Sequence, residues 1–289
     1  MGLKSSKLAR ILQTRSEFAD LIELLILSQP RSTFSVDKIR DSFPEYLNVD
    51  EVRVGIAIEE MRRRSRILST KYPFDVTSSR VLPQETSSIY QFLLATSFRA
   101  LLEETEETQQ EPLSKRFEEL SEFCLSEFFG EGTQLVNFGF PSAIGRPSNF
   151  PEAIEWLANR IGIETGSAYR NPRRQDGGVD LVLWRSFEDR KSGIPIVLVQ
   201  ATIQQDLIPK SRDIDLRLWS GWLSMDVDPL MALCCPQVVG NIEIWNEISR
   251  NCLLFDRIRM TQLSPRSFEG EVVDRLNLEF VLGEVADLG

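Results

Sequence analysis

Apolar residues recur at helical spacing in three segments near the start of the chain: residues 8–29, 36–43 and 49–68. Pro30 ends the first segment, and Ser35 is placed to cap the second. Asn48 or Asp50 stands near the start of the third. Residues 72–83 then read as extended chain. Three short helices followed by a strand pair is the arrangement of a winged helix-turn-helix, whose third helix is the recognition helix.

The third segment ends in a cluster of four arginines: Arg62, Arg63, Arg64 and Arg66. In a recognition helix, such side chains are placed to contact DNA phosphates. The alternative is a solvated helix C-terminus, where the helix dipole favours positive charge in any case. The sequence leaves both interpretations open, and many winged helices contact proteins instead of DNA.

Two further segments have helical spacing and broad apolar faces, residues 87–104 and 113–130. Gly130 is suited to end the second of them. We therefore predict a winged-helix-like domain over residues 1–83 and a helical connector over residues 84–132.

From residue 133 onwards the pattern predicts a mixed α/β core, so that the whole chain is α+β or α/β. Residues 151–162 begin with proline and end with glycine, as helices do. Residues 179–184 and 195–202 are short runs rich in Val, Ile and Leu, typical of a pair of strands buried on both faces. The remaining elements are predicted in order: a helix over residues 211–227, a strand over residues 229–238, and a helix with a strand-like run over residues 241–260. We expect one domain over residues 133–289.

Composition adds one decisive exclusion, because the 289 residues contain no histidine. This excludes Ser-His-Asp and Cys-His nucleophile systems and metal sites built on imidazole. The four cysteines include no C-x-x-C pair and lie in apolar stretches, as expected for buried thiols in a reducing cytosol. No apolar run is long enough to span a membrane, so we expect a cytoplasmic protein.

The formal net charge of −10 is not what a nucleic-acid-binding protein usually carries. The charge is uneven, however. Residues 1–80 contain 14 basic and 11 acidic side chains, whereas residues 81–160 contain 5 and 13. A local basic face on an acidic chain is still compatible with binding a polyanion.

The candidate chemistry lies in the predicted strand pair. Asp180 stands at the head of one strand, and Gln200 stands near the end of the next. A carboxylate and an amide oxygen on adjacent strands can converge on a hard cation such as Mg²⁺, which assists phosphodiester hydrolysis. Gly177 and Gly178 would let a substrate backbone approach closely. Asp176 is a register alternative to Asp180.

With these residues, the chain over 133–262 resembles the PD-(D/E)XK nuclease superfamily, which has the restriction-endonuclease-like fold. That family carries an acidic residue on a helix before the hairpin, an Asp at the second strand and a Glu-x-Lys tripeptide ending the third. By this resemblance, Asp180 is the strand aspartate, and Gln200 replaces the glutamate, as it does in several branches of the family. The lysine position holds Thr202.

Two groups of the family's active site must come from other positions. The resemblance assigns the helix acid to Glu155, with Glu152 and Glu164 as alternatives. Some family members carry the lysine on the following helix, which makes Lys210 the candidate. Lys191, in the turn of the hairpin, is its rival.

Three arginines precede the first of the two strands: Arg170, Arg173 and Arg174. Together with Tyr169 they are placed to hold a backbone phosphate, although a charged turn explains them equally well. Three tryptophans fall at apolar positions and are expected to belong to the core: Trp184, Trp219 and Trp222.

The first hypothesis is therefore a Mg²⁺- or Mn²⁺-dependent DNA nuclease that forms no membrane contact. The resemblance further implies a bacterial restriction or antiphage defence system, with a separate ATPase or sensor as partner, and a homo-oligomer is compatible with it. A second hypothesis is a nuclease-fold subunit that has lost cleavage and serves in DNA binding or assembly. A third is a winged-helix regulator with an unrelated α/β domain.

Overall fold

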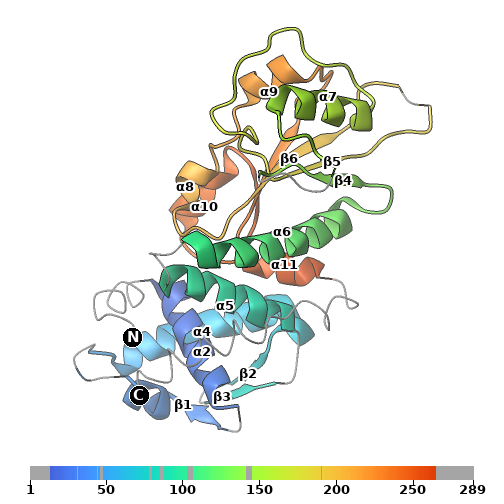
Figure 1. Ribbon diagram of the computed structural model, residues 1–289. Helices are drawn as coiled ribbons and strands as arrows, with labels where there is room; N and C mark the ends of the chain where they lie inside the picture. Colours follow the sequence, from blue (N-terminus) through green and yellow to red (C-terminus); the bar gives the residue numbers. More distant parts are fainter. Residues whose placement is uncertain are drawn as a thin grey trace. The chain divides into compact units, whose positions relative to one another are not determined.

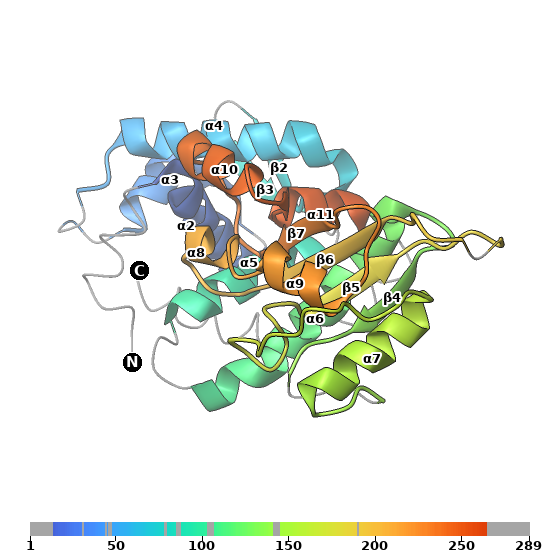
Figure 2. The same cartoon turned by 90° about the horizontal axis from the view of Figure 1, so that it is seen from above.

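A computed structural model describes residues 14–30, 32–43, 45, 48–77, 80–84, 88–102, 107–140, 145–189 and 191–264. The chain forms two compact units, shown in Figures 1 and 2. Unit 1 comprises Met1–Gln110, Pro236–Gly240 and Asp256–Gly289; unit 2 comprises Glu111–Cys235 and Asn241–Phe255. The three consecutive domains expected over residues 1–83, 84–132 and 133–289 stay a prediction. The contacts within the chain group the residues into two units instead.

Unit 1 combines helices with a small antiparallel sheet of order β1-β3-β2. Its elements are, along the chain, α2 (Arg15–Ser28), β1 (Phe34–Ser35), α3 (Val36–Asp41), α4 (Glu51–Leu68), the 3₁₀ turn η2 (Ser69–Lys71), β2 (Phe74–Val76), β3 (Arg80–Pro83), α5 (Ser88–Leu102) and α11 (Arg257–Leu263). The helices and the β2–β3 pair agree with the sequence prediction, whereas β1 and α11 were not predicted. Residues 8–13 of the predicted first helix lie outside the described residues.

Side-chain caps fix where two of these helices begin. Ser35 Oγ accepts a hydrogen bond from the backbone N–H of Lys38 at the start of α3. Asp50 Oδ1 accepts one from the backbone N–H of Arg53, at 2.8 Å, at the start of α4. Each cap satisfies an N–H group that has no partner within its helix. The cap at Ser35 is thus confirmed. Of the two residues considered for the start of α4, Asp50 and not Asn48 is the cap.

A cluster of charged side chains lies inside the apolar core of unit 1. The fully buried Arg64 of α4 donates to Asp20 at 2.5 Å and to Glu23 at 2.9 Å, both on α2. Arg257 of α11 binds the two oxygens of Asp20 at 2.9 and 2.8 Å. Paired, hydrogen-bonded charges of this kind are the form in which ions are tolerated in a core. The cluster therefore ties α4 and α11 to α2.

The pKa values of the two carboxyls of this cluster are shifted in opposite directions. Burial acts to raise the pKa of Asp20, but the two arginines offset this effect, and the pKa is lowered. At Glu23 burial prevails over the attraction of Arg64, and the pKa is raised. The hydroxyls of Tyr72 and Tyr90 donate to Glu23 at 2.5 and 2.8 Å. The carboxyl oxygens of Glu23 therefore accept hydrogen bonds from two neutral hydroxyls as well as from the guanidinium of Arg64.

Unit 2 is built on a five-stranded mixed sheet of order β4-β5-β6-β7-β8. Its elements are α6 (Glu107–Phe129, of which the residues from 111 onwards belong to unit 2), β4 (Gln134–Asn137), α7 (Phe150–Ile161), β5 (Leu181–Trp184), β6 (Ile196–Ala201), α8 (Leu207–Lys210), α9 (Leu216–Trp222), β7 (Leu230–Cys234), α10 (Ile242–Ser249) and β8 (Leu253–Phe255). Strands β4, β5 and β6 pair antiparallel, and β7 and β8 run parallel to β6.

Helices cover both faces of this sheet, which explains its apolar strands. Helices α7 and α9 lie on one face and α6 lies on the other (Figures 1 and 2). Strands β5 and β6 are buried along almost their whole length, with Leu181 opposite Val199 and Trp184 opposite Ile196. The predicted hairpin and the burial of the three tryptophans are confirmed.

Two features of unit 2 depart from the sequence prediction. Strand β4 was not predicted, because it is only four residues long and partly exposed. The helix expected over residues 211–227 is instead the short helix α9, preceded by the single turn α8. Lys210 is consequently the last residue of α8 and does not begin the following helix. None of the helices in the described ranges is long and apolar enough to cross a membrane.

The buried cluster predicts that two nearby arginines of α4, Arg64 and Arg66, contribute very differently to the free energy of unfolding. Arg64→Ala leaves Asp20 and Glu23 with one fewer cationic partner each inside the core, so we expect a loss of about 3–5 kcal/mol in unfolding free energy. Arg66→Ala, at an exposed position, should have little effect. Urea denaturation followed by circular dichroism measures both. Equal effects of the two substitutions would contradict the structural role given to Arg64.

Candidate functional site

The carboxyl of Asp180 lies at the point where β5 begins and β6 ends. Its backbone N–H donates to Val199 at 2.8 Å, and its carbonyl accepts from Phe138 at 2.7 Å, so the residue is fixed between the neighbours of β5 on both sides. Its side-chain Oδ2 accepts from the backbone N–H of Ala201 at 2.8 Å. The sheet itself therefore holds this carboxyl in one position.

Burial raises the pKa of the Asp180 carboxyl to about 8. Burial is the largest cause of this value, and the charges of Glu118 and Asp176 contribute to it in the same direction. The hydrogen bond from Ala201 and the charge of Lys210 act in the opposite direction. A carboxyl with this pKa is protonated at neutral pH unless a cation comes close to it.

Glu118 on α6, which was not predicted as a site residue, has the largest charge effect on the pKa of Asp180. Its carboxylate accepts from Asn137 of β4 at 3.4 Å, and its pKa is raised by burial, with a contribution from Asp176. Glu155, the residue expected to supply the helix carboxylate, is exposed on α7, and the largest charge effects on Asp180 come from Glu118, Asp176 and Lys210 instead. The expectation for Glu155 is therefore corrected, because α6 and not α7 presents a carboxylate to this end of the sheet.

The two alternatives considered for the helix acid do not replace it. Glu152 is exposed in the first turn of α7, and Glu164 is exposed after that helix ends. A signal that could have identified Glu118 is its spacing from Phe117, Leu120 and Cys124, which are buried. These positions place it at the border of the apolar face of α6.

One oxygen of Asp213 gathers three of the candidate side chains. Asp213 Oδ2 accepts from Gln200 Nε2 at 3.4 Å, from Lys210 Nζ at 3.2 Å and from Arg174 Nη1 at 2.9 Å. Asp213 lies in the connection between α8 and α9. Asp213 was not predicted as a site residue, because the sequence pattern placed it inside the helix expected over residues 211–227.

The structure also locates Thr202, which occupies the family's lysine position, and Lys191, the rival of Lys210. Thr202 is buried, and its hydroxyl accepts from the backbone N–H of Gln204 at 3.2 Å, so that it stabilises the turn after β6. Lys191 lies in the exposed β5–β6 turn, 3.7 Å from the carboxylate of Asp189. Lys210, whose side chain is 12% exposed, is thus the lysine that reaches the site.

The buried amide of Gln200 is only half satisfied. Its Nε2 donates to Asp213, whereas its Oε1 has no hydrogen-bond partner in the described part of the chain. Oxygen atoms of carboxylates and amides are the ligands that Mg²⁺ prefers, and Mg²⁺ usually needs only one or two carboxylates. Asp180, Glu118 and Gln200 therefore supply the kinds of oxygen atom that a divalent cation binds.

The acidic side chains do not suffice for such a site by themselves. Within the described ranges, no three His, Cys, Asp or Glu side chains lie close enough together to hold a metal ion. A cation at Asp180 would consequently depend on the Gln200 oxygen and on water for its remaining ligands. Asp176, the register alternative, lies in the turn and accepts from the backbone N–H of Gly178 at 2.7 Å.

The two glycines before β5 allow close packing within unit 2. Both have positive φ values, 63° for Gly177 and 81° for Gly178. A Cβ atom at Gly177 would lie 2.8 Å from the ring of Trp222, and one at Gly178 would lie 2.6 Å from the carbonyl oxygen of Asp213. The expectation that these glycines admit a substrate backbone is therefore replaced by a packing role.

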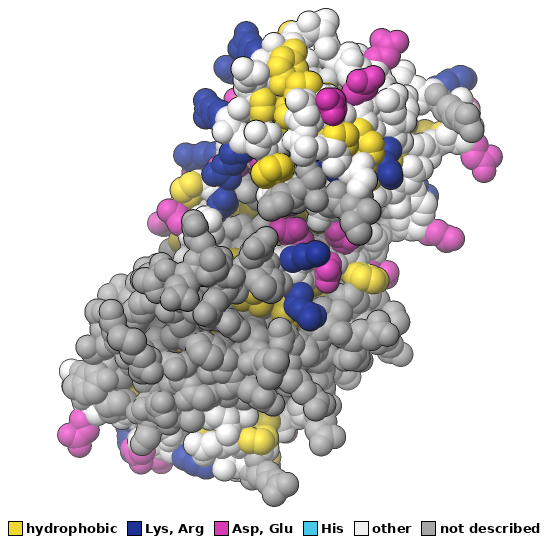
Figure 3. All heavy atoms as spheres, in the orientation of Figure 1, with side chains coloured by type: hydrophobic (Ala, Val, Ile, Leu, Met, Phe, Trp, Pro, Cys, Tyr) yellow, Lys and Arg dark blue, Asp and Glu magenta, His cyan; other side chains and the backbone are white. Residues whose placement is uncertain are grey.

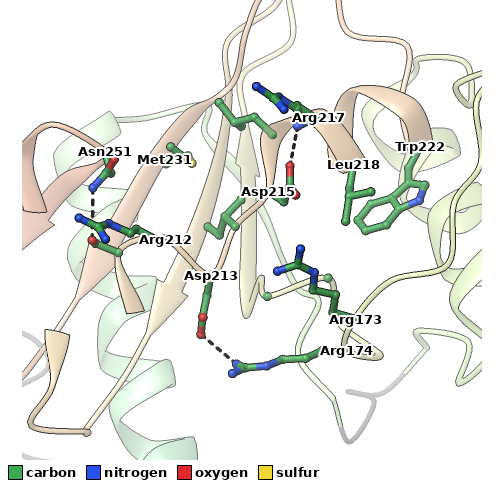
Figure 4. A pocket seen from close by; sticks show the side chains of 15 residues that line it. Arg173, Arg174, Arg212, Asp213, Asp215, Arg217, Leu218, Trp222, Met231 and Asn251 are labelled. Atoms are coloured by element: carbon green, nitrogen blue, oxygen red, sulfur yellow. Dashed lines mark hydrogen bonds and ion pairs between the residues drawn. The ribbon is translucent and has the colours of Figure 1, made fainter. Parts of the chain in front are cut away.

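A pocket with a volume of about 490 Å³ opens beside these residues (Figure 4). Arg173 and Arg174 line it, whereas Arg170 is exposed nearby and accepts a hydrogen bond from Trp222 through its carbonyl oxygen. Tyr169 is also exposed and does not line this pocket. On the face drawn in Figure 3, Lys and Arg side chains gather over α8 and α9. The predicted basic segment thus borders a real concavity.

The four arginines of α4 do not form a common surface for phosphates. Arg64 is fully buried, so the expectation that it contacts DNA is wrong for this residue. Arg62 pairs with Glu59, and Arg63 donates to Glu60 at 2.9 and 2.7 Å. Arg66 is exposed and donates to the carbonyl of Arg62 at 3.4 Å.

Comparison of the chain with protein-family models, with curated proteins and with solved structures finds no match.

The raised pKa of Asp180 predicts how stability depends on pH when no divalent cation is present. The pKa is near 3.8 without the fold and about 8 within it. The folded chain therefore binds more protons between these values, and its stability falls as pH rises from about 4 to 8. Asp180→Asn removes this loss, so its melting temperature should exceed that of the wild type by several degrees more at pH 8.5 than at pH 5.

Thermal unfolding in the presence of a chelator, at pH 5, 7 and 8.5, measures this difference. Glu155→Gln, at an exposed position, serves as the control and should follow the wild type at every pH. A difference between wild type and Asp180→Asn that stays constant across the pH range would show that the Asp180 carboxyl is not held protonated.

Proposed function

We propose that unit 2 is a divalent-cation-dependent nuclease that hydrolyses phosphodiester bonds in DNA. One observation carries this proposal: the buried Asp180 carboxyl, destabilised as an anion by burial and by Glu118, is accompanied by the unpartnered oxygen of Gln200. Charge repulsion and an unsatisfied acceptor are both relieved by a bound cation. Groups with strongly raised pKa values also cluster at functional sites.

The topology of unit 2 supports this function. A helix precedes three antiparallel strands, and the strands that follow run parallel to the third. The resemblance to the PD-(D/E)XK superfamily implies an acidic helix before the hairpin, and α6 would take that place. The element order α2-β1-α3-α4-β2-β3 similarly supports a winged-helix assignment for unit 1.

Each residue of the site has a distinct task in this proposal. Asp180, Glu118 and Gln200 would hold the cation, which when bound supplies a nucleophilic hydroxide and stabilises charge on the phosphate. Lys210 lies beside the site and orients the attacking water or offsets phosphate charge. Asp213 holds the ammonium of Lys210 and the amide of Gln200 in place, so it is a positioning residue.

A second candidate function is a nuclease-fold subunit that binds DNA or a partner without cleaving. The buried Thr202 at the usual lysine position and the involvement of Lys210 in an ion pair with Asp213 favour it. A role in a bacterial defence system, beside a separate ATPase or sensor, fits either candidate and rests on the resemblance.

The choice of helix acid gives the first test of the nuclease function. Glu118→Gln should lower cleavage of plasmid DNA by about 10²-fold or more, as loss of a group that stabilises transition-state charge does. Asp180→Asn should abolish it. Glu155→Gln is the matched control and should retain the wild-type rate. Mg²⁺ and Mn²⁺ are each used as the cation.

An active wild type with an active Glu118→Gln variant and an inactive Glu155→Gln variant would restore the helix acid first expected from the sequence. No cleavage by the wild type with either cation, on single-stranded or double-stranded DNA, would favour the non-cleaving subunit.

Lys210 gives an independent test. Lys210→Ala should lower turnover by about 10²- to 10⁴-fold, the usual range for a group that assists proton transfer, while the cation concentration that gives half-maximal activity stays the same. Lys191→Ala, in the exposed β5–β6 turn, is the matched control and should be unaffected. Single-turnover cleavage over a range of Mn²⁺ concentrations measures both quantities. A normal turnover in Lys210→Ala would remove Lys210 from the mechanism.

A further inference from the structure

The pocket of unit 2 has a lining that is unusually rich in arginine. Four arginines contribute to its wall: Arg173, Arg174, Arg212 and Arg217. They come from the loop before β5, from the connection between α8 and α9, and from α9 itself (Figure 4). Residues from these separate segments enclose about 490 Å³, within the range of pockets that bind small molecules.

Two of the four arginines are already paired within unit 2. Arg174 donates to Asp213 at 2.9 Å, and Arg212 pairs with Glu247. Arg173 and Arg217 are different, because neither guanidinium has a hydrogen-bond or ion-pair partner in the described part of the chain. Two guanidinium groups at one pocket are therefore free to bind an anion.

The acidic residues of the pocket do not neutralise these two arginines. The oxygen of Asp213 that faces the site is shared by Arg174, Lys210 and the Gln200 amide. Asp215 accepts from the backbone N–H of Arg217 at 3.0 Å and thereby caps α9. The electrostatic balance of the pocket thus remains positive on an otherwise acidic chain.

We propose that this pocket binds a phosphate monoester, either at the 5′ end of a polynucleotide or in a free nucleotide. A monoester carries close to two negative charges and three acceptor oxygens, and a guanidinium group can donate to such oxygens in pairs. A phosphodiester carries a single charge and uses the pocket less fully. This inference goes beyond the proposed nuclease function, since binding of the monoester does not require cleavage.

The remaining lining suits the organic part of such a ligand. Leu218, Trp222 and Met231 contribute apolar surface, and Asn251 contributes a polar amide (Figure 4). Ligand pockets commonly combine a mostly apolar wall with a few polar groups that fix orientation. A sugar or a base edge attached to the phosphate is accommodated by this wall.

The pocket is also connected to the candidate site through shared residues. Arg174 lines the pocket and binds the same oxygen of Asp213 that holds Gln200 and Lys210. A phosphate that draws Arg174 away from Asp213 would alter the surroundings of both side chains. If unit 2 cleaves DNA, the pocket therefore directs cleavage towards strands with a 5′-phosphate.

The test measures binding by the full chain carrying Asp180→Asn, with a chelator present, so that no cleavage occurs. Two single-stranded oligonucleotides of one sequence, with a fluorophore at the 3′ end, differ only in a 5′-phosphate or a 5′-hydroxyl. Thymidine 5′-monophosphate and thymidine serve as competitors that represent the free nucleotide. Fluorescence anisotropy measures the affinity for each strand and the competition by each nucleoside compound. The measurements are repeated after Arg173→Gln, Arg217→Gln or the control Arg185→Gln is introduced into the Asp180→Asn chain. Arg185 is exposed in unit 2 and does not line the pocket.

We expect the 5′-phosphorylated strand to bind about tenfold more tightly than the 5′-hydroxyl strand, a difference of about 1.4 kcal/mol. Arg173→Gln and Arg217→Gln should each reduce this preference, and Arg185→Gln should leave it unchanged. If the strands bind equally but the monophosphate competes better than thymidine, and this advantage depends on the same two arginines, the ligand is a free nucleotide.

Absence of any preference for the phosphate in both pairs would overturn the inference, as would a preference that persists in both Arg173→Gln and Arg217→Gln. Melting temperatures of the variants, measured alongside, show that loss of binding does not come from unfolding. Failure of the nuclease function leaves these binding results unchanged, because Asp180 is already substituted, so the two failures are distinguishable.

Discussion

Buried carboxylates determine how both units are built, because an anion removed from water must be paired with a cation or take up a proton. Asp20 in unit 1 lies between two arginines, and its pKa is lowered despite burial. Asp180 in unit 2 has two acidic neighbours, Glu118 and Asp176, and burial together with their charges outweighs the effect of Lys210, so that its pKa is raised to about 8. An aspartate side chain is therefore favoured as an anion at Asp20 in unit 1 and disfavoured as an anion at Asp180 in unit 2. The first arrangement stabilises a fold, whereas we propose that the second favours a bound cation.

The surroundings of Asp180 also show how a short connection organises the candidate site. Asp213 follows the single turn of α8, and one of its oxygens accepts from Gln200, Lys210 and Arg174. Its backbone packs against Gly178 so closely that a Cβ atom there would lie 2.6 Å from its carbonyl oxygen. The position of Asp213 is thus fixed by the main chain. Its carboxylate accepts hydrogen bonds from the three side chains and thereby restricts their positions as well.

Sequence reasoning succeeded where the pattern is local and failed where burial depends on distant residues. The apolar runs that contain or border Asp180 and Gln200 identified the hairpin and its candidate chemistry, since strands covered on both faces have a distinct composition. Glu118 was missed because the strand it faces, Gln134–Asn137, has only four residues and no clear alternation. Arg64 was grouped with its neighbours in sequence, although its partner Asp20 stands 44 residues away. Which of several similar arginines is buried cannot be read from their own segment.

The most direct test of this account is calorimetric titration of the protein with Mn²⁺ at pH 7, repeated in buffers with different ionisation enthalpies. A carboxyl with a pKa of about 8 is mostly protonated at this pH and must lose its proton to bind a metal ion. We predict that binding of one cation releases close to one proton from the wild type, and that Asp180→Asn neither binds the cation nor releases the proton. Binding that is unchanged in Asp180→Asn, or absent from the wild type, would contradict the assignment of Asp180 as the centre of a cation site.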